Sequence, residues 1–227
     1  MRLHALLPAL GVVFASAACA GGSLGTPAPI LDRDQAVRQA RLDNPFPNTS
    51  QVIFQWNVRE PDLRLGGMGV ARLQNPDRAR LDLFMENGEA VLAASLVGDQ
   101  LRAREGTQLE VVPSPAMLWA GLGVFRPGEG AILFGADAFD DATVRLRYRL
   151  TDGDELRYEL RSGRVTRAEL RHDGDAVYWV SVSRDGGAEL PTEAVYRNLA
   201  SFSELTVTVE TVERVNSHPS DIWYPVR

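Results

Sequence analysis

From residue 50 onward, apolar and polar residues alternate along the chain with a period of two. The segment 143–150, "TVRLRYRL", shows this most clearly, because Leu146 and Tyr148 fall on one side and Arg147 falls on the other. Successive side chains of a strand point to opposite faces, so such segments predict strands with one buried and one solvated face. The predicted strands are 52–58, 67–74, 78–84, 89–97, 99–104, 108–112, 143–150, 155–161, 164–172, 175–183 and 204–214.

Short turn signals separate these segments and indicate how the strands pair. Asn87-Gly88 and Asp152-Gly153 supply the positive backbone angles that tight hairpins require. Consecutive strands are therefore expected to be antiparallel neighbours. The outward arginines of 143–150 would then lie beside Glu155 and Glu159 of the next strand and form exposed cross-strand ion pairs.

Two regions interrupt the alternation. Residues 32–42, "DRDQAVRQARL", predict a helix that begins with an acidic cap at Asp32 or Asp34. Residues 113–128 begin with a proline-bounded helix signal that is apolar on most sides, and the apolar run continues through 131–135. A short helix of this kind must be buried, or it must meet lipid or a ligand.

These elements together predict the fold. A single sheet of about ten strands has to curl in order to bury its one apolar face. The short apolar helix is the natural filling for the concave side. The predicted fold class is mainly β with short helices (α+β), in which one curved antiparallel sheet forms a half-open barrel around a hydrophobic cavity plugged by helices.

The candidate ligand-binding residues are the large apolar side chains of the concave wall and of the filling helix. A concave face rich in aromatic residues and closed by an apolar helix leaves a space shaped for an acyl chain. The alternative is a fully packed core without a cavity. The candidates are Phe54, Trp56, Met117, Leu118, Trp119, Leu122 and Phe125.

Charge and composition exclude several classes of function. The 227-residue chain has a net charge of -6, which disfavours nucleic acid as a partner. A single cysteine excludes an intramolecular disulfide and a cysteine-based metal cluster. The sequence carries no G-x-S-x-G motif and no phosphate loop, and Asp137, Asp140 and Asp141 fit a solvated loop between helix and strand. We therefore expect a binding protein rather than an enzyme, without cofactor or metal.

The first 30 residues differ from the rest of the chain. Leu3–Ala18 is mostly apolar, has about the length of a signal-peptide core and is too short for a comfortable membrane span. Two kinds of processing are open: secretory cleavage after Ala17, or cleavage before a lipidated Cys19. The small, flexible residues after Cys19 favour the second. The expected organisation is a signal peptide at 1–18, a lipidated flexible tether at 19–30 and one domain at 31–227.

Several stretches together resemble a known family. A lipoprotein-type signal is followed by a short helix and an antiparallel meander. The helix "PAMLWAGLGV" at 115–124, a long strand within 189–216 and the C-terminal segment "DIWYPV" at 221–226 come after them. In this order they resemble the LolA/LolB-like outer-membrane lipoproteins. The resemblance implies a curved sheet around a cavity that accepts acyl chains, which in the best-known members carries lipoproteins to the outer membrane.

The resemblance also implies a location and partners. Lipidation of Cys19 would hold the protein in the bacterial envelope, at the outer membrane, with its domain facing the periplasm. Its partners would be that membrane and an acyl chain or a lipoprotein, with no nucleic acid, and we expect a monomer. The hairpin tip at 85–89, "MENGE", is polar where a LolB-type receptor projects an apolar residue. The alternative function is an envelope assembly or scaffold lipoprotein whose apolar groove docks a protein partner.

The assignment of Cys19 leads to a first prediction. Cys19→Ala removes the thiol that would carry the lipid, so the variant should leave the membrane fraction for the soluble periplasm or remain uncleaved. Cell fractionation and mass determination of the mature N-terminus measure both outcomes. A wild-type protein that is already soluble, with Ala18 as its first residue, would contradict lipidation.

Overall fold

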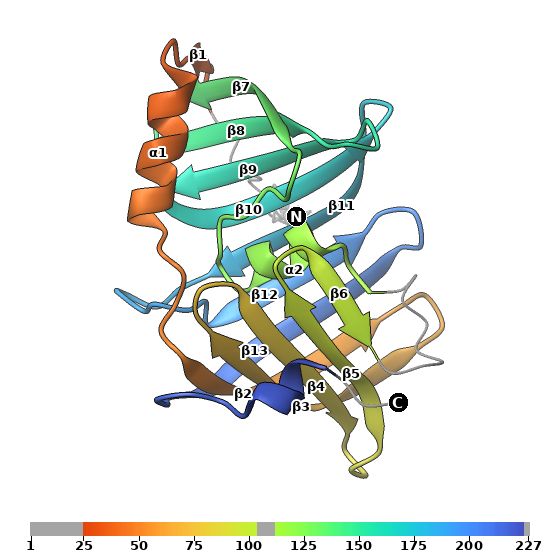
Figure 1. Cartoon of the computed structure of the whole chain (residues 1–227). Helices are drawn as coiled ribbons and strands as arrows, with labels where there is room; N and C mark the ends of the chain where they lie inside the picture. The colour runs from red at the N-terminus through yellow and green to blue at the C-terminus, as the bar shows by residue number, and fades with distance from the viewer. Residues whose placement is uncertain (1–24, 104–111, 225–227) are drawn as a thin grey trace, which may run out of the picture.

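The computed structural model describes residues 25–103 and 112–224, and one antiparallel sheet forms most of this part of the chain (Figure 1). The strands are β1 (Ala28–Pro29), β2 (Ser50–Arg59), β3 (Arg64–Gln74), β4 (Arg78–Met85), β5 (Ala90–Val97), β6 (Gln100–Ala103), β7 (Ile132–Ala138), β8 (Thr143–Arg149), β9 (Glu155–Arg161), β10 (Arg164–His172), β11 (Asp175–Ser183), β12 (Glu193–Asn198) and β13 (Ser203–Arg214). The sheet is curved and does not close, so the predicted, mainly β half-barrel is confirmed.

Two sequential meanders build this sheet. The strands β2 to β6 pair with consecutive neighbours, and so do β7 to β13. The meanders join where β13 pairs with β2, from Glu204 opposite Arg59 to Arg214 opposite Ser50. The short strand β1 pairs with β7 at one edge, and β6 forms the other edge. The first and last long strands therefore lie side by side near the middle of the sheet (Figure 1).

Three helical segments accompany the sheet within the described residues: α1 (Arg33–Asp43), α2 (Pro115–Gly121) and the 3-10 helix η2 (Ser220–Trp223). The predicted cap of α1 is confirmed at Asp32, whose carboxylate accepts a hydrogen bond from the backbone N–H of Gln35 at 2.8 Å. The predicted apolar helix is α2, which lies inside the curve of the sheet (Figure 1). The segment η2 packs on the outer face of β4 and β5, where the Ser95 hydroxyl donates to the backbone oxygen of Trp223 at 2.8 Å.

The segment after α2 differs from its prediction. The apolar run at 131–135 leads into β7, and Asp137 lies within that strand rather than in a loop. Glycine and alanine interrupt the alternation of "ILFGADA", so the strand has no clear period-two pattern. The strand β12 was also not predicted. The predicted strand 108–112 falls mostly outside the described residues, and Val112 is not in a strand.

Ion pairs cover the outer face of the second meander. The guanidinium of Arg145 on β8 pairs with Glu159 on β9 at 2.7 Å, which confirms one expected cross-strand pair. Arg147 instead reaches Asp137 on β7 at 3.2 Å, while Glu155 pairs with Arg157 of its own strand. These side chains are partly exposed, so each pair contributes under about 1 kcal/mol. Contact with water and these ion pairs therefore account for the charged side chains of the outer face.

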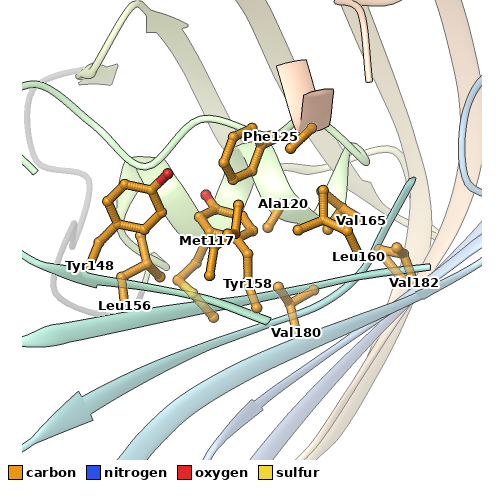
Figure 2. Close-up of a cluster of buried hydrophobic side chains, with 14 of the residues drawn as sticks. Met117, Ala120, Phe125, Tyr148, Leu156, Tyr158, Leu160, Val165, Val180 and Val182 are labelled. Atoms are coloured by element: carbon orange, nitrogen blue, oxygen red, sulfur yellow. The ribbon is translucent and has the colours of Figure 1, made fainter. Parts of the chain in front are cut away.

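The interior contains two clusters of buried apolar side chains. The first lies under β8 to β12 and includes Leu146, Leu156 and Tyr158, with Met117 and Phe125 packed on them (Figure 2). The second lies under β2 to β5 and is built around Phe54, Trp56, Leu73, Leu96 and Trp119. Helix α2 contributes to both clusters, so it stands between the two halves of the interior.

The register of β8 leads to a prediction for stability. Leu146 is 0% exposed in the first cluster, whereas Arg147 lies on the outer face. Leu146→Ala should lower the free energy of unfolding by about 2–5 kcal/mol because it leaves a cavity in packed surroundings. Arg147→Ala should cost under about 1 kcal/mol. Urea denaturation measures both, and equal losses would show that the strand register is wrong.

Candidate functional site

An apolar cavity of about 540 Å³ lies in the second half of the interior, between the sheet and α2. Its volume falls within the range of small-molecule binding sites. No charged residue lines it within the described part of the chain. The lining residues are Val52, Phe54, Trp56, Val58, Leu65, Ala71, Leu81, Leu83, Val91, Leu92, Val112, Pro113, Leu118, Gly121, Leu122, Leu190, Pro191, Ala194, Tyr196, Leu205, Val207 and Val209.

The wall follows from the register of the central strands. Val207 of β13 lies between Ala194 of β12 and Trp56 of β2, so three neighbouring strands present apolar side chains at one level. Phe54 lies opposite Gly69 of β3. A Cβ atom on Gly69 would lie 2.3 Å from the Phe54 ring, so the glycine leaves the space that this ring occupies.

One end of the cavity is closed by tightly packed side chains. Leu73, Leu96 and Trp119 are all almost fully buried there. The Trp119 indole packs edge-to-face on Phe46, with ring centroids 5.5 Å apart. Its N–H donates a hydrogen bond to the backbone oxygen of Gly98 at 2.8 Å, which fixes the ring between α2 and the β5–β6 turn. Trp119 therefore seals this end rather than lining the space.

The opposite end of the cavity is open to solvent. Val91, at the start of β5, lines the cavity and is 49% exposed. Leu65, near the start of β3, lines the same end and is only partly buried. A ligand can therefore enter past the β2–β3 and β4–β5 hairpins and extend inward along the sheet toward Trp119.

Helix α2 separates the cavity from the packed half of the interior. Leu118, Gly121 and Leu122 line the cavity, and their spacing of three and four residues places them on one helix face. Met117 and Ala120 belong to the first buried cluster on the other side. A single short helix thus serves as the wall of the cavity and as part of a packed core.

The structure places the seven candidate ligand-binding residues in two environments. Phe54, Trp56, Leu118 and Leu122 line the cavity. Met117 and Trp119 are buried without lining it, and Phe125 packs edge-to-face on Tyr158 with centroids 5.0 Å apart. The candidate lipidation site Cys19 lies outside the described residues.

Several cavity residues were not found from the sequence. Leu205, Val207 and Val209 alternate within a predicted strand, so their shared face was available as a signal. That face could not be assigned to the cavity, because β12 was not recognised and the pairing of β13 with β2 is long-range. Tyr196 lies on the unrecognised β12 itself.

The ionisable groups of the described residues do not form a reactive centre at this cavity. No group of three or more histidine, cysteine, aspartate or glutamate side chains in this part of the chain has the arrangement of a metal site. Burial raises the pKa of the Tyr196 phenol above its ordinary value, so this lining group stays neutral. In the described part of the chain, no helix has the length and apolar character needed to cross a bilayer. The geometry is suited to binding an apolar molecule.

Solved structures with this fold are known. The chain superposes on a LolA superfamily protein of Nitrosomonas europaea with a TM-score of 0.56 and 13% identity, over 83% of this chain and 96% of that chain. It matches an outer membrane lipoprotein-sorting protein domain of Vibrio parahaemolyticus with a TM-score of 0.54 and 6% identity, over 83% and 94%. For a DUF1329 family protein of Desulfovibrio piger, the TM-score is 0.50 and the identity 12%, over 84% and 94%.

These likenesses define the fold class. No family model matches the sequence, and no curated protein matches it either. At such low identity, the agreement in structure shows the fold alone. The protein has a LolA-like fold, as the resemblance of its sequence predicted.

The contrast between cavity and packed core can be tested by truncation. Leu156 is fully buried in the first cluster, whereas Leu205 lines the cavity and is only partly buried. Leu156→Ala should cost about 2–5 kcal/mol because it creates a new void. Leu205→Ala should cost about 1–2 kcal/mol, since this side chain already borders open space. Thermal denaturation followed by circular dichroism compares them, and similar losses would indicate a packed core around Leu205.

Proposed function

We propose that this protein is an envelope lipoprotein that binds the acyl chain of a lipid or a lipoprotein in the cavity beside α2. The observation that carries the proposal is the wall, which is mostly apolar, carries no charged side chain among the described residues and reaches solvent at Val91. Each methylene group buried there contributes about 0.8 kcal/mol, so a long chain binds without any ionic contact. A binding protein of this kind needs no catalytic residue.

The structural neighbours support this proposal at a coarser level. One of them is described as an outer membrane lipoprotein-sorting protein domain, and another belongs to the LolA superfamily. They suggest binding and sorting of lipids or lipoproteins in the envelope.

The proposal includes membrane anchoring through Cys19. The apolar stretch Leu3–Ala18, the small residues before Cys19 and the flexible residues after it support a lipidated N-terminus. A single acyl chain anchors only marginally, whereas several chains on one cysteine hold a protein firmly. The folded domain would then face the periplasm from the outer membrane and act as a monomer.

A second candidate function is docking of a protein partner. Two turns near the open end of the cavity carry exposed apolar side chains, Leu63 on the β2–β3 turn and Phe202 on the β12–β13 turn, and Phe202 is 80% exposed. Exposed apolar groups beside a cavity favour contact with another macromolecule. In this alternative, the groove would receive an apolar segment of an envelope protein.

Paired substitutions on β13 test the lipid-binding function. Val207 lines the cavity, whereas its neighbour Thr208 is exposed on the opposite face. The fluorescent ester methyl cis-parinarate should bind the delipidated wild-type protein saturably, with an increase in probe emission. Val207→Trp should weaken this binding because the indole occupies part of the cavity, and Thr208→Trp should leave it unchanged. Circular dichroism confirms that both variants are folded.

The same titration separates the two candidate functions. Absence of saturable probe binding by the folded wild-type protein would contradict the acyl-binding function. Native mass spectrometry of protein released gently from its membrane then identifies the natural occupant. A bound species of lipid mass agrees with acyl binding, and a bound polypeptide without lipid agrees with docking.

A further inference from the structure

Two residues of the cavity wall carry a polar side-chain atom, and they differ in one respect. The indole N–H of Trp56 is satisfied, because it lies 3.1 Å from the backbone oxygen of Met68 and 3.2 Å from that of Phe84. The hydroxyl of Tyr196 has no hydrogen-bond partner among the described residues, and the side chain that carries it lines the cavity and is only partly buried. Tyr158, in contrast, donates to the backbone oxygen of Arg126 at 2.8 Å. Tyr196 is thus the unpaired polar group of an otherwise apolar wall.

The position of the Tyr196 hydroxyl is fixed by α2. A Cβ atom on Gly121 would lie 1.7 Å from this oxygen, so the phenol reaches across to the helix at a point where only glycine leaves room. Gly121 is the last residue of α2, so the end of this helix leaves the space that the hydroxyl occupies.

The hydroxyl lies at the level of the open end. Tyr196 is opposite Leu205 on β13, which is opposite Val58 on β2, which is opposite Leu65 on β3. This row is the one beside the β2–β3 hairpin, and the row that contains Leu73 lies at the closed end. An acyl chain that extends from the open end to the closed end therefore places the atoms nearest the opening beside Tyr196.

A chain bound in the cavity would displace water from this hydroxyl, and a hydroxyl left unpaired in an apolar space is unfavourable, so the ligand itself should supply a partner. An acceptor is the partner that matches the O–H donor of a neutral phenol. Among the described lining residues there is no cationic side chain to accompany an anion, which favours an uncharged partner. The carbonyl oxygen of an ester or amide meets both conditions, and a hydrocarbon meets neither.

We propose that the Tyr196 hydroxyl donates a hydrogen bond to the ester or amide carbonyl of an acyl group whose chain extends toward Trp119. Tyr196 is thereby a specificity-determining residue, and the ligand class is an acylated molecule rather than a hydrocarbon or a free fatty acid. This inference rests on the proposed acyl-binding function and adds to it the identity of the bound group and its direction.

The test compares three probes of similar length: methyl palmitate, palmitate and n-hexadecane. Binding of each radiolabelled probe to the wild-type protein and to Tyr196→Phe is measured by gel filtration at pH 8. Loss of one neutral hydrogen bond should raise the dissociation constant for methyl palmitate about 3- to 10-fold. The constant for n-hexadecane should change by less than about twofold. In the wild type, methyl palmitate should bind more tightly than palmitate.

A spectroscopic readout and a control variant separate hydrogen bonding from shape. Methyl palmitate labelled with 13C at its carbonyl should show a downfield carbonyl resonance in the wild type that moves upfield in Tyr196→Phe. The control is Tyr148→Phe, which removes a buried hydroxyl of the first cluster that also has no partner and does not line the cavity. Tyr148→Phe should leave the dissociation constants of all three probes unchanged. Both variants should melt no lower than the wild type, because neither loses an intramolecular hydrogen bond.

The outcomes separate a failure of the role proposed for Tyr196 from a failure of the acyl-binding function on which it rests. If no probe binds the folded wild type, acyl binding itself is wrong. If all probes bind and Tyr196→Phe changes neither the dissociation constant nor the carbonyl resonance, acyl binding stands and the role of Tyr196 is wrong. Tighter binding of palmitate than of its methyl ester would overturn the assignment to esters and amides.

Discussion

Helix α2 determines how much of the sheet is covered. A curved sheet with one apolar face needs an apolar partner on its concave side. The partner here is only seven residues long and lies toward the second meander, so it packs fully on that half of the face and covers the half under β2 to β5 only in part. The position of α2 therefore determines both where the interior is packed and where the cavity lies.

Much of this architecture could be predicted from the alternation of side chains. The strict period of residues such as Leu146 and Arg147 identified strand faces, and Asp32 marked the start of α1. Strands with glycine or alanine at key positions, above all β7, were not predicted, because small residues carry little information about which face of a strand is buried. Local pattern therefore predicted elements well and missed those whose identity depends on their neighbours.

The candidate site was only partly predictable for a related reason. Met117 and Leu118 are adjacent apolar residues of one helix, and nothing in their sequence separates them. Their roles differ because the helix is in contact with the packed cluster on one side and with the cavity on the other. Tyr196 could not be assigned without the pairing of β12 with β13, since only that register brings it to the cavity wall. Cavity residues that lie on strands far apart in the chain could be identified only from the tertiary structure.

The junction of β13 with β2 has a consequence for how the protein forms. Trp56 and Val207 face each other across this junction, so the cavity wall is made of residues from the beginning and the end of the domain. Long-range pairing of this kind is slow, because loop closure must precede the contacts that stabilise it. During synthesis, the edge of β2 that pairs with β13 stays unpaired until this last long strand has been made. Until then, the apolar side chains of β2 that line the cavity in the folded protein are exposed, which makes the incomplete chain prone to association.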